Sequence, residues 1–118
     1  MSNLEDHRAK AAHNEALAAS LAASFEDWAV VALFYAAVHY VEAHFAKNVP
    51  PVHSQNHDRR DSAIASSKVL KPQWKNYREL KNQSRAARYY AHIVFTQADV
   101  DAAKTRLEAV KLVILPTL

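Results

Sequence analysis

Residues 27–42 read DWAVVALFYAAVHYVE. Apolar side chains recur in this run at spacings of three and four residues, which is the period of an α-helix. They fall on most faces of the helix, and a helix that is apolar on most faces is typically buried. We therefore expect a central helix from about residue 26 to residue 46. Two polar groups near its end, His39 and Glu42, are expected to be poorly solvated.

The rest of the chain predicts four further helices and no strand. Ser54 or Asn56 is suited to begin a short helix after the loop that contains Pro50-Pro51. Thr96-Gln97-Ala98-Asp99 matches a capping box, and Pro116 closes the helix that follows it. The predicted segments are helices at 3 to about 23 and 26 to 46, a loop at 47 to 55, helices from 54 or 56 to about 67 and from Pro72 to about Ile93, and a last helix between Thr96 and Pro116.

The length and composition suit a single folded unit. The chain has 118 residues, and 50% of them are hydrophobic, which is enough to bury a core without disulfides or metal. We predict one domain, residues 1–118, with an all-α fold: an up-and-down antiparallel bundle of four to five helices.

Two residue types are missing, and their absence excludes several kinds of site. Without cysteine, the chain has no disulfide, no thiolate metal site and no cysteine nucleophile. Without glycine, it lacks the loops that let backbone approach a phosphate in P-loop and Rossmann proteins. Any phosphate would therefore be held by side chains.

The charge and the start of the chain bear on partners and location. The net charge is +3 and the pI is about 9.3, which permits an anionic partner but is weaker than the field of a dedicated duplex binder. The polar start lacks a signal-peptide apolar run, so we expect a cytoplasmic protein. The apolar stretch 28–41 is too short to cross a bilayer, and no membrane association is predicted.

Residues 84–92 read SRAARYYAH and predict a site for a phosphate-bearing ligand. Spacings of three, four and seven residues place Arg85, Arg88 and His92 on one helical face. Arginine holds phosphate by bidentate hydrogen bonds, and histidine transfers protons near neutral pH. The alternative is structural: the arginines pair with acids such as Glu42 or Glu79 and hold the helices in register.

The other polar groups have structural interpretations. Glu42 is expected to be the partner of Arg85 or Arg88, and His39 to be a buried histidine bonded to a hydroxyl or a carbonyl. Residues 58–61, DRRD, read as a solvated charged face. His53 and His57 have the i,i+4 spacing of two metal ligands, but no third ligand is evident, so no metal and no cofactor are predicted.

Aromatic side chains flank the basic residues of the predicted fourth helix. Trp74, Tyr77, Tyr89 and Tyr90 alternate there with lysines and arginines. Such rings can stack on the bases of single-stranded RNA, but they also form helix–helix and dimer contacts. For Trp74 and Tyr89 we expect a place in the core or in an interface.

At these residues the chain resembles the HEPN family of small helical bundles, from about residue 14 to residue 113. No single piece is specific, but their order and spacing match together. The matching pieces are Asp27-Trp28-Ala29-Val30, the run from Phe34 to Glu42, His53-Ser54 with Arg59, Tyr77-Arg78-Glu79-Leu80, the run from Ser84 to Tyr89, and a last helix after an acidic cap.

The resemblance implies a homodimer associated with nucleotide or RNA biology. Some HEPN proteins are metal-independent RNases whose signature is an arginine, four to six residues and a histidine, a spacing that Arg85 and His92 match. Active members tend to carry a polar residue after that arginine, and Ala86 departs from this pattern. The implied ligand residues are Arg85, Arg88, Tyr89, His53 and Arg59, with His39, Glu42 and Tyr77 in support.

We therefore predict a nucleotide- or RNA-associated binding module. It would belong to a two-component system of the toxin–antitoxin or nucleotidyltransferase-linked kind. One alternative is a metal-independent ribonuclease that uses Arg85 and His92. The other is a purely structural protein-interaction module.

Overall fold

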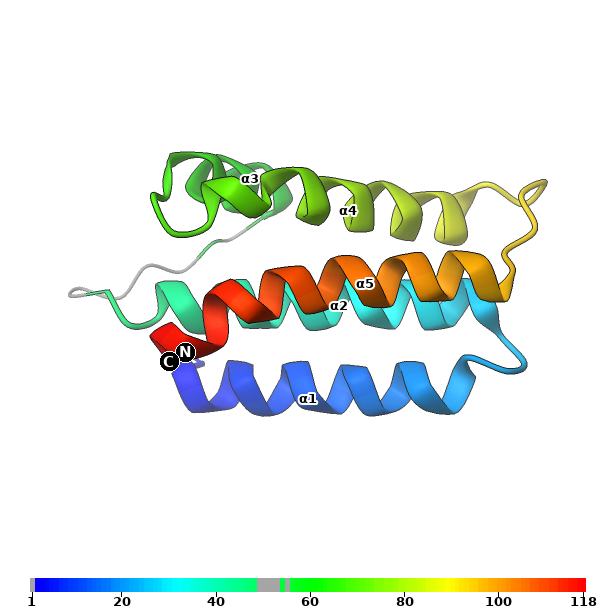
Figure 1. Ribbon diagram of the computed structural model, residues 1–118, viewed down its shortest axis with the longest axis horizontal. Helices are drawn as coiled ribbons and strands as arrows, with labels where there is room; N and C mark the ends of the chain where they lie inside the picture. Colours follow the sequence, from blue (N-terminus) through cyan, green and yellow to red (C-terminus); the bar gives the residue numbers. More distant parts are fainter. Residues whose placement is uncertain (1, 49–53, 55) are drawn as a thin grey trace.

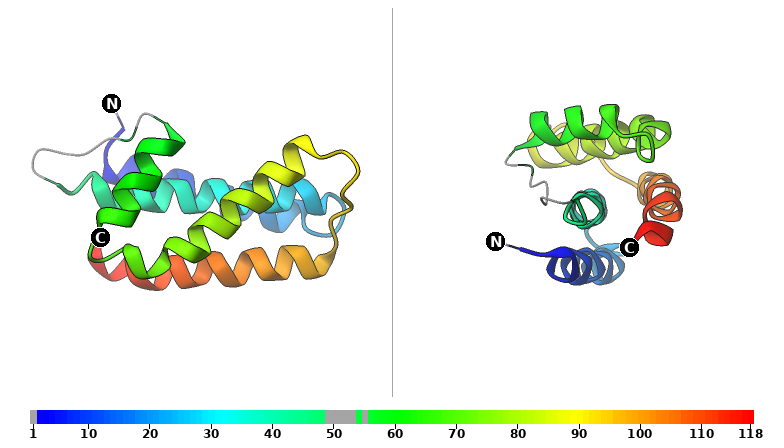
Figure 2. Two further views of the ribbon diagram at one scale, coloured as in Figure 1. Left: turned by 90° about the horizontal axis from the view of Figure 1, so that it is seen from above. Right: turned by 90° about the vertical axis from the view of Figure 1, so that its left-hand side faces the viewer.

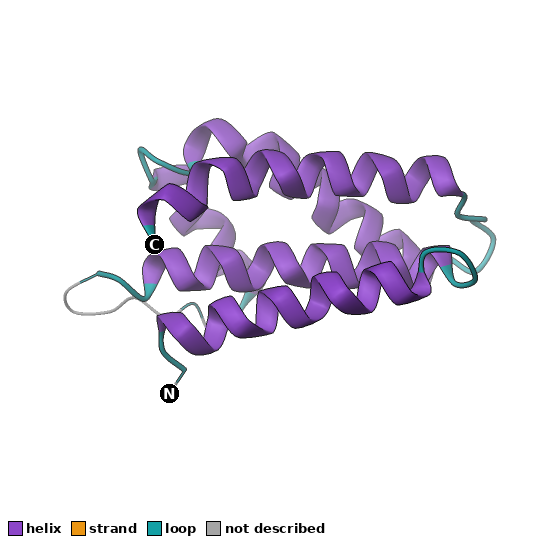
Figure 3. Cartoon of the chain, turned by 60° about the horizontal axis from the view of Figure 1, so that its bottom comes forward, coloured by secondary structure: helices purple, strands orange, loops and turns teal. Residues whose placement is uncertain are grey.

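The chain folds as an all-α bundle, as the sequence predicts. The computed structural model describes residues 2–48, 54 and 56–118, and in this part every regular element is helical (Figure 1 and Figure 3). The long helices α1, α2, α4 and α5 run alternately up and down in chain order. The α-helices are α1 (Leu4–Leu21), α2 (Glu26–Phe45), α3 (His57–Ser66), α4 (Trp74–Tyr89) and α5 (Gln97–Ile114), and short 3₁₀ turns cover Lys71–Gln73 and Leu115–Thr117.

α2 is the central helix, as predicted. It packs against α1, α4 and α5, and the end-on view shows it with α1 on one side and α3 and α4 on the opposite side (Figure 2). Val30 and Phe34 are 0% exposed, and Val41 is 1% exposed. Burying such side chains is the main favourable contribution to the stability of the bundle.

Small residues let α1 approach α2 closely. Ala11 and Ala18 on α1 and Ala29 and Ala36 on α2 are all at most 1% exposed. Asn14 is the buried polar residue in this contact, and it lies on the same face of α1 because it stands three residues after Ala11 and four before Ala18.

α2 is longer than the predicted apolar stretch. Over its 20 residues, Glu26–Phe45, it is long and apolar enough to cross a membrane by length and composition alone, which corrects the expectation from residues 28–41. Most of the helix is buried among the other helices, as in the core of a globular bundle, so this is weak support for a membrane span.

The predicted caps are present where the structure describes them. The Asn56 side chain accepts a hydrogen bond from the Arg59 backbone N–H (2.8 Å) and begins α3. The Asp99 carboxylate accepts one from the Thr96 backbone N–H (2.8 Å) at the start of α5. These bonds satisfy backbone groups that a helix terminus leaves free. The predicted loop residues Pro50 and Pro51 lie outside the described residues.

α4 differs from its predicted bounds at both ends. Pro72 lies in the preceding 3₁₀ turn, and α4 ends at Tyr89 rather than near Ile93. The residues after Tyr89 are mainly aromatic or β-branched, and these lose side-chain freedom in a helix. Instead, the Ile93 backbone N–H bonds to the Tyr90 carbonyl (3.1 Å) in a turn.

Candidate anion-binding site

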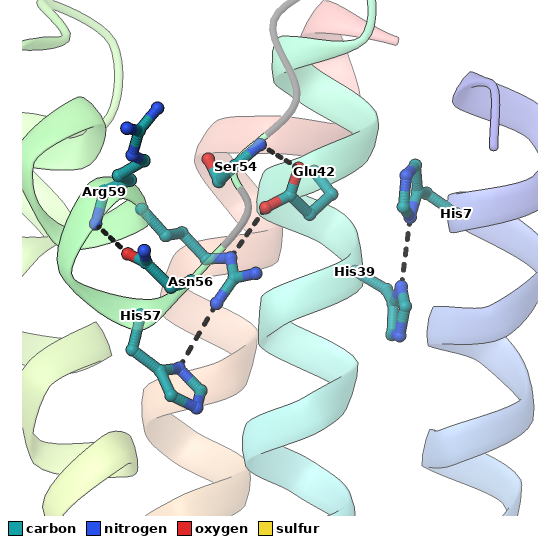
Figure 4. A network of polar contacts seen from close by, with 8 residues as sticks. His7, His39, Glu42, Ser54, Asn56, His57 and Arg59 are labelled. Carbon is teal, nitrogen blue, oxygen red and sulfur yellow. Dashed lines mark hydrogen bonds and ion pairs between the residues drawn. The ribbon is translucent and has the colours of Figure 1, made fainter. Parts of the chain in front are cut away.

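Glu42 lies in a buried ion pair with Arg60, which joins α3 to α2 (Figure 4). Arg60 Nε stands 2.7 Å from Glu42 Oε1, and the two residues are 8% and 4% exposed. The Ser54 backbone N–H donates a hydrogen bond to the other carboxylate oxygen (3.4 Å). The expectation that Glu42 pairs with Arg85 or Arg88 is therefore wrong.

Arg60 also corrects the prediction of a solvated charged face at residues 58–61. Asn56 caps α3, and Arg60 and Ile64, four residues apart, share the inward face of this helix. Asp61 also has a partner, since it accepts a hydrogen bond from Lys81 on α4. Asp58 and Arg59 remain exposed, as expected.

His57 lies beside this pair with one ring nitrogen engaged. Arg60 Nη1 stands 3.2 Å from His57 Nδ1 (Figure 4). An arginine can only donate, so Nδ1 accepts and the proton of the neutral ring is on Nε2. Burial lowers the pKa of His57, and the charges of Arg60, Lys81 and Arg88 lower it further against the opposing effect of Asp61.

A cavity of about 420 Å³ lies between α3 and α4, and we name it the basic pocket. Three of its side chains are cations, and one of them, Lys81, is paired with Asp61. A surplus of positive charge in a concave site attracts anions. The basic pocket is lined by His57, Lys81, Arg85, Arg88 and Tyr89.

Arg88 is held in place by α2 and by its own helix. Its Nη1 donates to the Tyr35 hydroxyl (3.0 Å) and its Nε to the Ser84 carbonyl (3.2 Å). The guanidinium also lies over the rings of Tyr35 and Tyr89, 5.7 and 5.1 Å from their centroids. These contacts fix the orientation of a charged group in the pocket wall.

Arg85, unlike Arg88, is not held in place by other side chains of the described chain. It is exposed, and in the described part of the chain it forms no ion pair. The structural alternative, in which Arg85 pairs with Glu42 or Glu79, does not hold, since Glu42 pairs with Arg60 and Glu79 with Arg106 (2.9 Å). Its planar fork is therefore available to an anion that enters the pocket.

Tyr89 and His92 lie differently from their predicted positions. Tyr89 is 68% exposed at the rim of the basic pocket, so its expected place in the core is wrong, while a place in an interface stays a prediction. His92 does not share a helical face with Arg85, because α4 ends at Tyr89. It is exposed in the following turn, where its ring stacks on Tyr90 at 6.2 Å.

One further predicted ligand residue, Arg59, is not brought into the pocket. Arg59 is exposed and its side chain points away from Glu42 and His57 (Figure 4). His53 lies outside the described residues, so the proposed pair with His57 is untested. Among the residues that the structure does describe, no three His, Asp or Glu side chains form a metal-binding group.

The residues predicted to give structural support lie close by. His39 is half-buried, and its Nδ1 bonds to His7 Nδ1 (3.0 Å) rather than to the expected hydroxyl or carbonyl. Tyr77 is 1% exposed and its ring packs between Phe34 and Trp74, with centroids 5.7 and 6.3 Å away. Trp74 is partly buried against the core, as expected.

With this geometry known, the chain was compared with other proteins. Neither protein-family models, nor curated proteins, nor solved structures match it. The resemblance to HEPN proteins therefore stays a prediction from the order and spacing of residues.

Two residues of the basic pocket, His57 and Lys81, were not predicted from the sequence as phosphate ligands. Lys81 stands four residues before Arg85 and seven before Arg88, so the helical spacing that marked the arginines also includes it. His57 carries no such signal, because it reaches the pocket only through the packing of α3 against α4.

Proposed function

We propose that the chain is a nucleotide- or RNA-associated binding module, in which the basic pocket holds a phosphate group. One observation carries the proposal: Lys81, Arg85 and Arg88 line one cavity, and Arg85 forms no ion pair in the described part of the chain. A cation that is already paired with a carboxylate has fewer free donors for a phosphate and attracts it less strongly.

Four of the five pocket residues have a distinct part in holding a phosphate. Arg88 is oriented by Tyr35 and supplies a fixed charge, while Arg85 supplies a free bidentate fork. His57 contributes its Nε2–H as a donor, since Nδ1 is engaged with Arg60. The exposed Tyr89 ring offers a stacking surface for a base next to the phosphate.

The same features favour binding over cleavage. A general base needs a nitrogen free to accept a proton, and the accepting nitrogen of His57 already holds the Arg60 N–H. His92, the histidine of the predicted ribonuclease pair, lies beyond the end of α4 and outside the pocket lining.

The binding test uses a fluorescently labelled single-stranded RNA, with anisotropy followed over a salt series and AMP and inorganic phosphate as competitors. Arg85→Ala is expected to weaken binding about tenfold or more. It should also reduce the slope of log affinity against log salt by about 0.7. Arg78→Ala is the matched control, because Arg78 is exposed on the same helix outside the pocket.

Equal losses in the two arginine variants would contradict the proposal, since the binding would then be a general surface-charge effect. Competition by AMP at the concentration that displaces RNA would assign the pocket to a nucleotide. Failure of AMP to compete, with binding retained, would assign it to RNA.

The ribonuclease alternative is tested in the same preparation. The protein is incubated with a structured RNA in EDTA beside Arg85→Ala and His92→Ala variants whose helicity is checked. Cleavage by the wild-type chain alone, with 2′,3′-cyclic phosphate ends, would replace the binding proposal with a metal-independent nuclease. Uncleaved RNA supports the binding module.

We also propose that the module acts as a homodimer or with a nucleotidyltransferase partner, as the HEPN resemblance implies. Large apolar side chains at the end of α4 and in the following turn are exposed, which suits an interface beside the basic pocket. These side chains are Tyr89, Tyr90, Ile93 and Val94.

A further inference from the structure

A second cavity lies between α1 and α2, and it is apolar over most of its wall. Its volume of about 580 Å³ is within the range of small-molecule sites. Three of its large side chains are unusually open to solvent: Leu17, Phe25 and Trp28 are 44%, 57% and 51% exposed. Leu21, Val31 and Ala32 complete this part of the lining.

Apart from Tyr35, whose hydroxyl accepts a hydrogen bond from Arg88, the most polar lining residues gather at one end of the cavity. Lys10 and Asn14 stand one turn apart on α1, and His39 lies opposite them on α2. α1 and α2 run antiparallel (Figure 1). Leu21, the last residue of α1, and Trp28, in the first turn of α2, therefore belong to the other end of the lining. No acidic side chain is part of the described lining.

Asn14 is the feature that points to a ligand. The residue is only 8% exposed, it lines the cavity, and its carboxamide makes no hydrogen bond to any described residue. The side-chain atoms that are sealed from water without a partner in the described chain lie elsewhere, so the Asn14 amide opens into the cavity rather than into a dry core. The Asn14 amide therefore has unused donors and an acceptor at the polar end of an otherwise apolar space.

We propose that this cavity binds a medium-chain carboxylate. The Asn14 N–H donors and the Lys10 ammonium receive the carboxylate, while the alkyl chain lies along Leu21, Phe25 and Trp28. Charge complementarity supports an anion, since Lys10 is the only charged group among the described lining residues apart from the ionisable His39. Asn14 to Leu21 spans roughly 10 Å of helix at 1.5 Å per residue, which suits a chain of the length of decanoate.

Tryptophan fluorescence tests the proposal directly. The chain has two tryptophans, so Trp74→Phe leaves Trp28 as the reporter inside the cavity. Titration with decanoate is expected to shift Trp28 emission to the blue with saturation, because the alkyl chain displaces water from the ring. Decan-1-ol, which lacks the charge, should bind about tenfold more weakly or worse. Calorimetry of decanoate binding to the wild-type chain gives a readout independent of the Trp74 substitution.

Asn14→Leu tests the residue on which the proposal rests. It removes the amide at nearly constant volume and is expected to weaken decanoate binding more than decan-1-ol binding, while Lys10 keeps part of the preference for the anion. Lys75→Gln is the control, since Lys75 is an exposed lysine on α4 outside this cavity. It should leave both affinities unchanged.

Three results would overturn the proposal. The first is the absence of saturable heat and of a saturable Trp28 shift below the concentration at which decanoate forms micelles. The second is unchanged decanoate binding in Asn14→Leu. The third is a Trp28 spectrum that shifts with protein concentration alone while light scattering reports a dimer, which would assign the cavity to a second copy of the chain.

Discussion

At the scale of single residues, the Arg60–Glu42 pair is the most deeply buried ion pair in the described part of the chain. Both side chains are withdrawn from water, and Arg60 Nε stands 2.7 Å from Glu42 Oε1. Removal of Arg60 alone leaves the carboxylate buried without its cation. We expect Arg60→Met to lower the free energy of unfolding by about 3–5 kcal/mol. Urea denaturation followed by circular dichroism measures this.

Two comparison variants make the experiment specific. Arg106→Met removes a pair whose side chains are 27% and 35% exposed, so its expected cost is about 1 kcal/mol or less. The double variant Arg60→Met/Glu42→Leu removes both buried charges and is expected to recover most of the loss. If Arg60→Met lowers the free energy of unfolding by no more than Arg106→Met does, the result would contradict the burial of the Arg60–Glu42 pair.

We expect the histidines to make the stability of the bundle depend on pH. Burial is the main cause that lowers the pKa of His39, His44 and His57, and positive neighbours add to it. The unfolded chain, with histidine pKa values of about 6.5, then binds more protons than the folded chain below that pH. The free energy of unfolding should therefore fall as the pH drops from about 7 to about 5.

Urea titrations across this range measure the effect, and His57→Gln should flatten part of the slope. Histidine NMR provides the matching local readout. We expect His57 to titrate below about 6.5 and to hold its neutral-form proton on Nε2. A His57 pKa above the ordinary value would contradict the burial and the neighbouring charges described here.

At the scale of elements, α3 is the helix least integrated into the bundle. It spans 10 residues, His57–Ser66, and its buried residues are Arg60 and Ile64. The Asn56 cap is therefore a large part of its local stability. We expect Asn56→Ala to destabilise α3 by about 1 kcal/mol and to speed amide exchange there, with little change in α2.

Hydrogen exchange by mass spectrometry resolves the two helices. Asn3→Ala, which removes the corresponding cap of α1, is the matched control, because the Asn3 side chain accepts from the Asp6 N–H (2.9 Å). Faster exchange over the whole chain in Asn56→Ala would mean that α3 does not open separately.

Local pattern predicted the elements well and the polar contacts poorly. The buried face of α2 and the caps at Asn56 and Asp99 depend on residues within a few positions of one another, so the sequence displays them. The Arg60–Glu42 pair joins residues 18 positions apart, and its burial depends on how α3 docks. The end of α4 was missed for a different reason, since only weak propensities mark it.

For the candidate site, too, the sequence predicted the residues that lie on one helix and not those that come from another. Arg85 and Arg88 were found from helical spacing within α4, and they do line one cavity. His57 enters that cavity from another helix, and nothing in the residues around it indicates this. His92 satisfies the expected spacing in sequence but not in space, because the helix ends first.

At the scale of the whole molecule, the exposed side chains Tyr89, Tyr90, Ile93 and Val94 favour self-association. We expect a dimer in light scattering, and Val94→Lys should shift the chain toward monomer because Val94 is 83% exposed and would be covered only in a dimer. Leu112→Lys on α5, at a position 78% exposed, is the control. A wild-type chain that stays monomeric at high concentration would contradict the homodimer.

The position of α2 in the chain has a consequence during synthesis. α2 is synthesised before α5, one of the helices that cover it. Roughly 70 residues separate the ends of α2 and α5, and at about 5–20 residues per second the ribosome needs several seconds or more to add them. During that time the nascent chain exposes the face of α2 that α5 will later cover. A chaperone that binds apolar helices would protect the chain most in this interval.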